Sequence, residues 1–243
     1  MSSLFRNDPM YHRFYRLWQD MNLGLAALFG DFLQMPLART YELYELWCFL
    51  RLLRAAVEEY GSSEVDLSSL FSTNTAGGVT ISANAVSIPV APDKVLCFQR
   101  QYREYWIEPD GTGSFSRTMV PDVVLAGAGL CGKGKQIIVL DAKYRINDGL
   151  NDALSSIHTY RDALVRESED DGIEAIVTAA YLLTPHVPTL ESDYKKTPIP
   201  GRLFHPQYRE TFRFGAVTLR PGMSGEQLRT TFKTIIADAT GKR

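Results

Sequence analysis

Cysteine is scarce in this sequence of 243 residues, which contains three, Cys48, Cys97 and Cys131. They are odd in number and far apart, and no CxxC motif or paired cysteine–histidine spacing accompanies them. The four histidines are equally scattered. The sequence therefore predicts neither a structural zinc site nor a disulfide framework, and its thiols are expected to be reduced.

Long apolar runs are also missing. No stretch is long enough to cross a bilayer as a helix. The first twenty residues lack the apolar centre and the cleavage site of a signal peptide. These features predict a cytoplasmic protein that does not associate with a membrane.

The sequence has no surplus of positive charge. Its 26 lysines and arginines stand against 28 aspartates and glutamates, for a net charge of -2. Domains that bind nucleic acid strongly by themselves are normally basic. Binding to nucleic acid would therefore depend on a local basic patch or on a partner that delivers the substrate.

What the sequence has is an ordinary globular composition, 45% hydrophobic and 22% charged. Its length suits one domain with a helical extension. We expect an N-terminal helical extension over residues 1–39, with a helix starting at Asp8–Pro9, and a main domain over residues 40–243. Helical periodicity predicts three helices in the main domain: Thr40–Gly61, 149–166, and 224–239 with Ser224 as its N-cap.

Strand patterns fill much of the remaining main domain, after a connector of uncertain structure over 61–93. The expected strands are VLCFQRQY (95–102), REYWIE (103–108), VPDVVLA (120–126), QIIVLDAKYR (136–145), AIVTAAYLLT (175–184) and FRFGAVTLR (212–220). We expect the first two to pair with each other. The order of elements predicts an α/β fold with a mixed central sheet flanked by helices, rather than a βαβ repeat with a parallel sheet.

Asp141 and Lys143 form the first candidate for chemistry. Residues two apart in a strand share a face, so both side chains point the same way. The preceding run of apolar residues at 137–140 predicts a central, buried strand. A carboxylate and an ammonium at the end of such a strand cost free energy unless something binds them, so they are candidates for function.

Asp122 is the second candidate, because it begins the strand that leads into the glycine-rich loop GAGLCGKGK. If the two strands form a hairpin centred on Cys131 and Gly132, antiparallel partners have numbers that sum to 263, and Asp122 faces Asp141. Two carboxylates there repel each other unless a cation lies between them. Hard oxygen ligands in small number suit Mg²⁺ or Mn²⁺.

Glu45 is the third candidate, since it lies among apolar residues of the Thr40–Gly61 helix and needs a partner. This helix is expected to pack on the sheet, which would bring Glu45 near the two aspartates. Such carboxylates could hold one or two metal ions, and a bound metal lowers the pKa of a water molecule and neutralises a phosphate. Lys143 could then orient that water or stabilise developing negative charge. This chemistry is hydrolysis of a phosphodiester bond.

The spacing from VPDVVL to DAK resembles the signature of the PD-(D/E)XK nucleases. The segments YELYELWCFL, VPDVVL, IIVLDAKYR and IHTYRDAL, in that order, are similar to the nuclease region of McrC-type subunits of modification-dependent restriction systems. This resemblance implies a restriction-endonuclease-like core, a catalytic set of Glu45, Asp122, Asp141 and Lys143, and Mg²⁺ or Mn²⁺ held by the three carboxylates.

The same resemblance implies substrate contacts and a partner. Tyr160 and Arg161 lie on the helix behind the motif, where the superfamily often places polar residues that contact substrate. Independently of the resemblance, Lys133 and Lys135 in the glycine-rich loop could contact a DNA backbone or simply be solvated. That loop lacks the GxxxxGK[ST] pattern of a P-loop, whereas McrC-type subunits work with an AAA+ GTPase or ATPase. The N-terminal domain of McrC-type proteins is expected to be absent or reduced here, and a homo-oligomer is left open.

Each motif also has a structural explanation. Asp141 and Lys143 could form a surface salt bridge, Pro121–Asp122 could simply start a strand, and Glu45 could be a solvated helix residue. Three functions compete: a DNA endonuclease that acts in defence against foreign DNA, a nuclease fold kept as a DNA-binding or assembly module without catalysis, and a nuclease that acts on RNA or free ends. Metal-dependent cleavage separates the first from the second.

Overall fold

The computed structural model describes residues 40–61, 65–73, 79–81, 85–128, 135–144, 149–168 and 172–241. The helix expected from Asp8 lies outside these residues. The chain divides into two units, one of Met1–Arg39 with Leu67–Ala83 and one of Thr40–Asp66 with Asn84–Arg243. In the first unit, the described elements are a 3₁₀ turn, η3 (Ser68–Leu70), and the antiparallel strands β1 (Phe71–Thr73) and β2 (Val79–Ile81).

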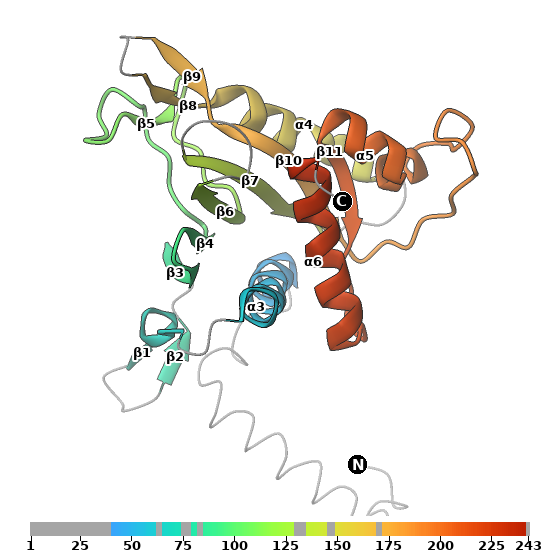
Figure 1. Ribbon diagram of the computed structural model, residues 1–243, viewed down its shortest axis with the longest axis horizontal. Coiled ribbons are helices and arrows are strands. Elements are labelled where there is room, and N and C mark those ends of the chain that lie inside the picture. The colour runs from blue at the N-terminus through green and yellow to red at the C-terminus, as the bar shows by residue number, and fades with distance from the viewer. Residues whose placement is uncertain are drawn as a thin grey trace, which may run out of the picture. The chain divides into compact units, whose positions relative to one another are not determined.

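The second unit holds the α/β core (Figure 1). Its helices are α3 (Thr40–Tyr60), α4 (Gly149–Ala163), η4 (Gly201–Phe204), α5 (Pro206–Phe212) and α6 (Gly225–Thr240). Its strands are β3 (Val86–Ala91), β4 (Lys94–Phe98), β5 (Thr112–Ser114), β6 (Val123–Ala128), β7 (Lys135–Ala142), β8 (Leu164–Glu167), β9 (Ile173–Ala175), β10 (Val177–Thr184) and β11 (Phe214–Thr218).

The central sheet has six strands in the order β11-β10-β7-β6-β4-β3. Neighbours from β3 to β7 are antiparallel, whereas β10 runs parallel to both β7 and β11. The expected mixed sheet is therefore confirmed. Strand β7 lies in the middle and is buried on both faces, which accounts for its continuous apolar run.

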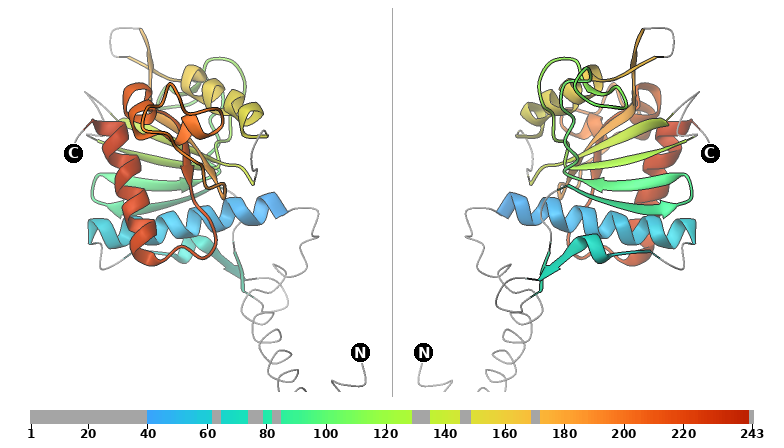
Figure 2. Two further views of the ribbon diagram at one scale, coloured as in Figure 1. Left: turned by 90° about the vertical axis from the view of Figure 1, so that its right-hand side faces the viewer. Right: turned by 90° about the vertical axis from the view of Figure 1, so that its left-hand side faces the viewer.

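Helices cover both faces of this sheet (Figure 2). On one face, Leu150 and Ile157 of α4 belong to a buried cluster with Val124 of β6 and Val139 of β7. On the other face, α3 packs against the sheet and against α6. There the ring of Phe49 lies 5.1 Å from that of Phe98 on β4. The alternation of side chains along β7 thus sends odd-numbered residues toward α4 and even-numbered residues toward α3.

Sequence signals explain where the helices begin and end. Ser224 accepts a hydrogen bond from the backbone of Gln227, whose side chain bonds back to Ser224, forming the capping box expected at the start of α6. Gly61 has φ of 65° directly after α3, a conformation that glycine adopts without strain. None of the helices described is both long and apolar enough to span a membrane.

Two expectations about local structure are wrong. Residues 103–108 do not form a strand paired with 95–102, because β4 ends at Phe98 and its two edges are taken by β3 and β6. Gln99 then adopts a left-handed conformation, with φ of 48°, which turns the chain away from the sheet. The helix expected over 149–166 ends at Ala163, since Leu164–Glu167 pair with β5 and β9 as strand β8.

The chain leaves the sheet after Gln99 and returns at Asp122, and we call this excursion the 99–121 loop. A hydrogen bond of 2.8 Å from the Gln99 amide to the Asp122 carbonyl closes its base. Strand β5, within the loop, joins β8 and β9 in a small antiparallel sheet. The loop therefore starts and ends beside Asp122.

Candidate active site

The β6–β7 hairpin has the register that the sequence predicted. Val123 lies opposite Leu140 and Val124 opposite Val139, so that partners sum to 263 along the ladder. Asp122 immediately precedes the first of these pairs and Asp141 follows it. Both carboxylates therefore project from the same end of the hairpin, on the face that α4 covers.

Lys143 joins the two aspartates. Its Nζ atom lies 2.8 Å from Oδ2 of Asp141 and 3.7 Å from Oδ2 of Asp122. The Asp141 side chain is 1% exposed, that of Asp122 11% and that of Lys143 27%. The ammonium is thus the most solvent-accessible of the three groups, and the two carboxylates are more deeply buried.

Further hydrogen bonds hold each carboxylate in place. Oδ2 of Asp122 accepts a bond of 2.7 Å from the backbone amide of Ala142. Oδ2 of Asp141 accepts a bond of 2.6 Å from the hydroxyl of Ser156 on α4. Each aspartate is therefore oriented by a strand or helix rather than by a mobile loop, as a preorganised site requires.

Glu45 reaches the same site from α3. It is 9% exposed, and Nε2 of Gln99 donates a hydrogen bond of 3.2 Å to its Oε2. Burial raises the pKa of Glu45, Lys143 opposes that rise and Asp141 adds to it. The helix therefore brings the third carboxylate within electrostatic range of the other two, although its direct partner is Gln99.

The close spacing of the acidic groups contributes to the raised pKa values of Asp122 and Lys143. Burial and the neighbouring Asp141 raise the pKa of Asp122 to about 8, against the pull of Lys143. Burial lowers the pKa of Lys143, but Asp141 and Asp122 outweigh it and the net pKa is raised. The site thus holds one firm positive charge among carboxylates that resist carrying full negative charge together, as expected where a further cation binds.

The donor set fits a hard divalent cation held by two carboxylates. Among the residues described, no three histidine, cysteine, aspartate or glutamate side chains form a ready-made metal cage. Asp122 and Asp141 nevertheless each lie within 3.7 Å of the Nζ atom of Lys143, so one positively charged group already lies beside both carboxylates. Mg²⁺ is usually bound by one or two carboxylates, with water and substrate phosphate completing its shell.

The other residues expected to contact substrate are dispersed. Tyr160 lies on α4, where burial and, to a smaller extent, the nearby carboxylates raise the pKa of its hydroxyl. That hydroxyl donates to the Val120 carbonyl at 3.1 Å. Arg161 instead donates to the Phe212 carbonyl at 3.2 Å, which ties it to the end of α5. Lys135 begins β7, six residues and about 20 Å of strand from Asp141. Lys133 lies outside the described residues.

Two residues of the site escaped the sequence reasoning, Gln99 and Ser156. Ser156 lies four residues before Tyr160, which places both on one face of α4, and this spacing could have revealed it. Gln99 follows an ordinary strand, and only the packing of α3 on the sheet brings it to Glu45. It carries no comparable signal in the sequence.

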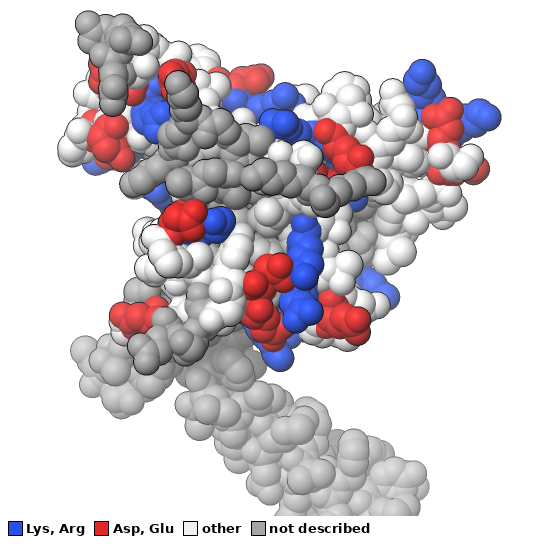
Figure 3. Space-filling model, viewed as in Figure 1, with Lys and Arg blue, Asp and Glu red and all other residues white. Residues whose placement is uncertain are grey.

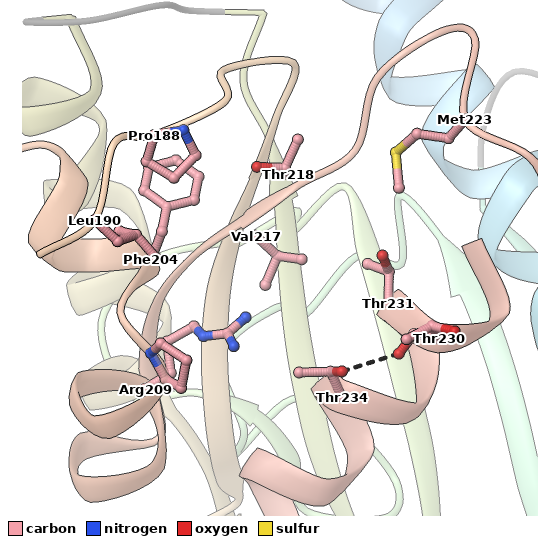
Figure 4. A pocket seen from close by; sticks show the side chains of 11 residues that line it. Pro188, Leu190, Phe204, Arg209, Val217, Thr218, Met223, Thr230, Thr231 and Thr234 are labelled. Atoms are coloured by element: carbon pink, nitrogen blue, oxygen red, sulfur yellow. Dashed lines mark hydrogen bonds between the residues drawn. The ribbon is translucent and has the colours of Figure 1, made fainter. Parts of the chain in front are cut away.

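A cavity of about 340 Å³, which none of the three carboxylates lines, is shown in Figure 4. Its walls are mostly apolar side chains and the threonines of α6, with Arg209 pointing into it. The Nε atom of Arg209 lies 3.4 Å from Oδ2 of Asp238, so its charge is already balanced. This cavity holds none of the three carboxylates and is not the candidate for catalysis.

The comparisons with known proteins agree with this geometry. A family model of the PD-(D/E)XK nuclease superfamily matches residues 42–188, a range that includes Glu45, Asp122, Asp141 and Lys143. Searches of curated proteins and of solved structures gave no match. The matched range spans more than half of the chain and contains the helix, the hairpin and the clustered side chains described above. The chain belongs to the PD-(D/E)XK nuclease superfamily.

Proposed function

We propose that this protein is a metal-dependent endonuclease that hydrolyses the phosphodiester bonds of DNA. The observation that carries the proposal is the cluster of Asp122, Asp141 and Lys143 at one end of the β6–β7 hairpin. Nucleases of this superfamily generally use divalent metals. Mg²⁺ or Mn²⁺ suits two buried carboxylates that share a contact.

Each residue of the site has a role that follows from its position. Asp122 and Asp141 would hold the cation, and Glu45, which accepts a hydrogen bond from Gln99, would supply a third carboxylate nearby. When bound, the divalent cation lowers the pKa of a water molecule and offsets the charge of the phosphate. Lys143 exchanges its contact with the aspartates for one with the attacking water or with a phosphate oxygen, where its positive charge stabilises the transition state.

DNA and a role in defence against foreign DNA are the substrate and the setting that we propose. The resemblance to McrC-type nuclease regions supports both, and it suggests an AAA+ partner that delivers DNA. The face drawn in Figure 3 agrees with such dependence, because acidic and basic side chains are interspersed over its described part and form no broad basic area. The alternative substrate is RNA, and a direct comparison of substrates decides between them.

Cleavage of plasmid, linear DNA and RNA with Mg²⁺ or Mn²⁺ tests the proposal. Wild type is compared with Lys143→Ala and Asp141→Ala, and Lys233→Ala is the matched control. Lys233 lies on the surface of α6, where it pairs with Glu59 at 3.2 Å. We expect metal-dependent cleavage of DNA that the control retains and that Lys143→Ala reduces by at least about 100-fold.

Cleavage that survives in both active-site variants would contradict the assignment of this site. If wild type cuts nothing, calorimetry with Mn²⁺ separates two explanations. Metal binding that is lost in Asp141→Ala would indicate a catalytic site that lacks its partner. Absence of metal binding in wild type would instead support a nuclease fold that acts as a binding or assembly module.

A further inference from the structure

A cavity of about 240 Å³ adjoins the catalytic carboxylates. The 99–121 loop and α4 form its walls, and its lining residues are Arg117, Met119, Ser155, Ser156, Thr159 and Tyr160. The volume is many times the roughly 30 Å³ that one water occupies in the liquid. The cavity therefore has room for a phosphate group and part of the attached sugar.

The cavity and the catalytic centre share a wall. Ser156 lines the cavity, and its hydroxyl donates to Asp141 at 2.6 Å. Tyr160 lines it too, and the charges of Asp141 and Asp122 act on its hydroxyl. A strand whose phosphate is attacked at the carboxylates would therefore place a neighbouring nucleotide in or beside this cavity.

Arg117 supplies positive charge at this cavity. Its side chain is exposed, and within the described part of the chain it makes no hydrogen bond or ion pair. By contrast, Arg103 in the same loop pairs with Glu108 at 2.7 Å, and Arg166 of β8 pairs with Glu174 at 3.4 Å. Arg117 is thus a cation available to a ligand, beside a centre whose own Lys143 is held by two aspartates.

The backbone around Arg117 is braced on both sides. Two residues later, Met119 exchanges a pair of 2.8 Å backbone hydrogen bonds with Tyr102. Two residues earlier, the amide of Phe115 donates to the carbonyl of Ala163 at the end of α4, at 3.0 Å. The hydroxyl of Tyr160 holds Val120 from the same helix. The fold therefore fixes the backbone at Arg117, so that binding a ligand would have to order only its side chain.

We propose that this cavity binds a backbone phosphate of the nucleic-acid strand, next to the phosphate that is cleaved. Arg117 supplies the charge, and the hydroxyls of Ser155 and Thr159, which now donate to carbonyls of α4 at 3.0 and 2.8 Å, can rotate to donate to the phosphate. Three carboxylates repel a polyanionic strand, so a nearby cation is needed to hold it in register. The inference rests on the proposed nuclease function and adds a substrate subsite to it.

The test compares Arg117→Gln with Arg103→Gln as a matched control on the same loop. Binding of a labelled DNA duplex is measured by fluorescence anisotropy in EDTA over a range of salt concentrations. One lost phosphate contact lowers the slope of log K against log salt by about 0.9. We expect that change for Arg117→Gln and not for Arg103→Gln, together with a raised KM and a nearly unchanged kcat when Mg²⁺ is added.

A second measurement locates the contact. Methylphosphonate linkages, which remove the charge of single phosphates, are placed one at a time along the duplex. At one position next to the cleaved bond, the substitution should weaken binding by wild type but not by Arg117→Gln. Sensitivity to a missing base at that position, without sensitivity to the methylphosphonate, would overturn the inference in favour of a base pocket.

The experiments give different results if the phosphate subsite is wrong than if the proposed nuclease function is wrong. If both arginine variants bind with the wild-type slope while Lys143→Ala still abolishes cleavage, the subsite is refuted and the nuclease stands. If wild type binds no nucleic acid, the subsite is refuted, and calorimetry with Mn²⁺ on wild type and Asp141→Ala then decides the nuclease separately. Because Arg117 is exposed, its replacement should leave the thermal unfolding curve unchanged, and this control excludes a folding defect.

Discussion

Asp122→Asn should inactivate the protein and, in the absence of metal, stabilise it. Asp122 is 8% exposed and faces Asp141 across the hairpin, which together raise its pKa from 3.8 to about 8. A carboxyl whose pKa is raised on folding favours the folded state below its ordinary pKa, and this contribution is lost as the pH rises toward 8. Asparagine is uncharged throughout, and its Oδ1 can still accept the hydrogen bond from Ala142.

The magnitude follows from the same pKa values. One pKa unit corresponds to about 1.4 kcal/mol, so the interval from 3.8 to about 8 sets an upper limit of roughly 6 kcal/mol. Loss of the attraction to Lys143 at 3.7 Å reduces the gain. We therefore expect about 2 kcal/mol at pH 8, or a Tm higher by roughly 4–8 °C, and a much smaller difference at pH 4.

Asp141→Asn is the matched comparison, with the opposite expected sign. Asp141 is the nearest partner of Lys143, at 2.8 Å, and it also accepts the hydrogen bond from Ser156. Its neutralisation removes the nearer of the two counter-charges of a largely buried ammonium, which should cost about 1–3 kcal/mol. Both variants should lose cleavage, so that activity and stability separate.

Thermal and urea unfolding in EDTA, at pH 4, 6 and 8, measure these effects. The reasoning would be refuted if Asp122→Asn destabilised the protein as much as Asp141→Asn does. A stabilisation that did not grow with pH would also refute it, because the charge of Asp122 would then not be its cause.

Three further predictions concern the scaffold that positions the site. Gly113→Ala should destabilise the protein by more than about 2 kcal/mol, because a Cβ would overlap the carbonyl oxygen of Arg103. An unchanged stability in urea unfolding would contradict this close packing. Ser224→Ala removes the N-cap of α6 and should cost about 1 kcal/mol, with cleavage unchanged; an unaltered midpoint of unfolding would contradict the capping role. Tyr44→Phe leaves the buried Leu219 carbonyl without its 2.5 Å hydrogen bond and should cost about 1–2 kcal/mol by the same assay, whereas a neutral effect would mean that water replaces the hydroxyl.

Local patterns in the sequence were sufficient to predict the β6–β7 hairpin and the positions of α3, α4 and α6. Two apolar strands around a symmetric glycine-rich loop leave one register that keeps both faces buried, so the position of Asp122 opposite Asp141 could be worked out in advance. The bounds of α3 and α6 also followed from periodicity and caps. The misassigned segments, 103–108 and 164–167, are those whose partners lie elsewhere in the chain, and their apolar residues suit a strand, a turn or a helix end equally well.

The sequence by itself determined the two aspartates, the lysine, the mixed sheet and the resemblance to a nuclease family, because these follow from local apolar patterns, from the order of the elements and from short motifs. Only the tertiary structure decided that Lys143 lies between the two carboxylates, that Gln99 holds Glu45, and that Ser156 and Arg117 meet beside Asp141. These contacts join α3, α4 and the 99–121 loop to the hairpin. They arise where helices pack on opposite faces of one sheet, and contacts between such distant segments cannot be predicted from spacing along the chain.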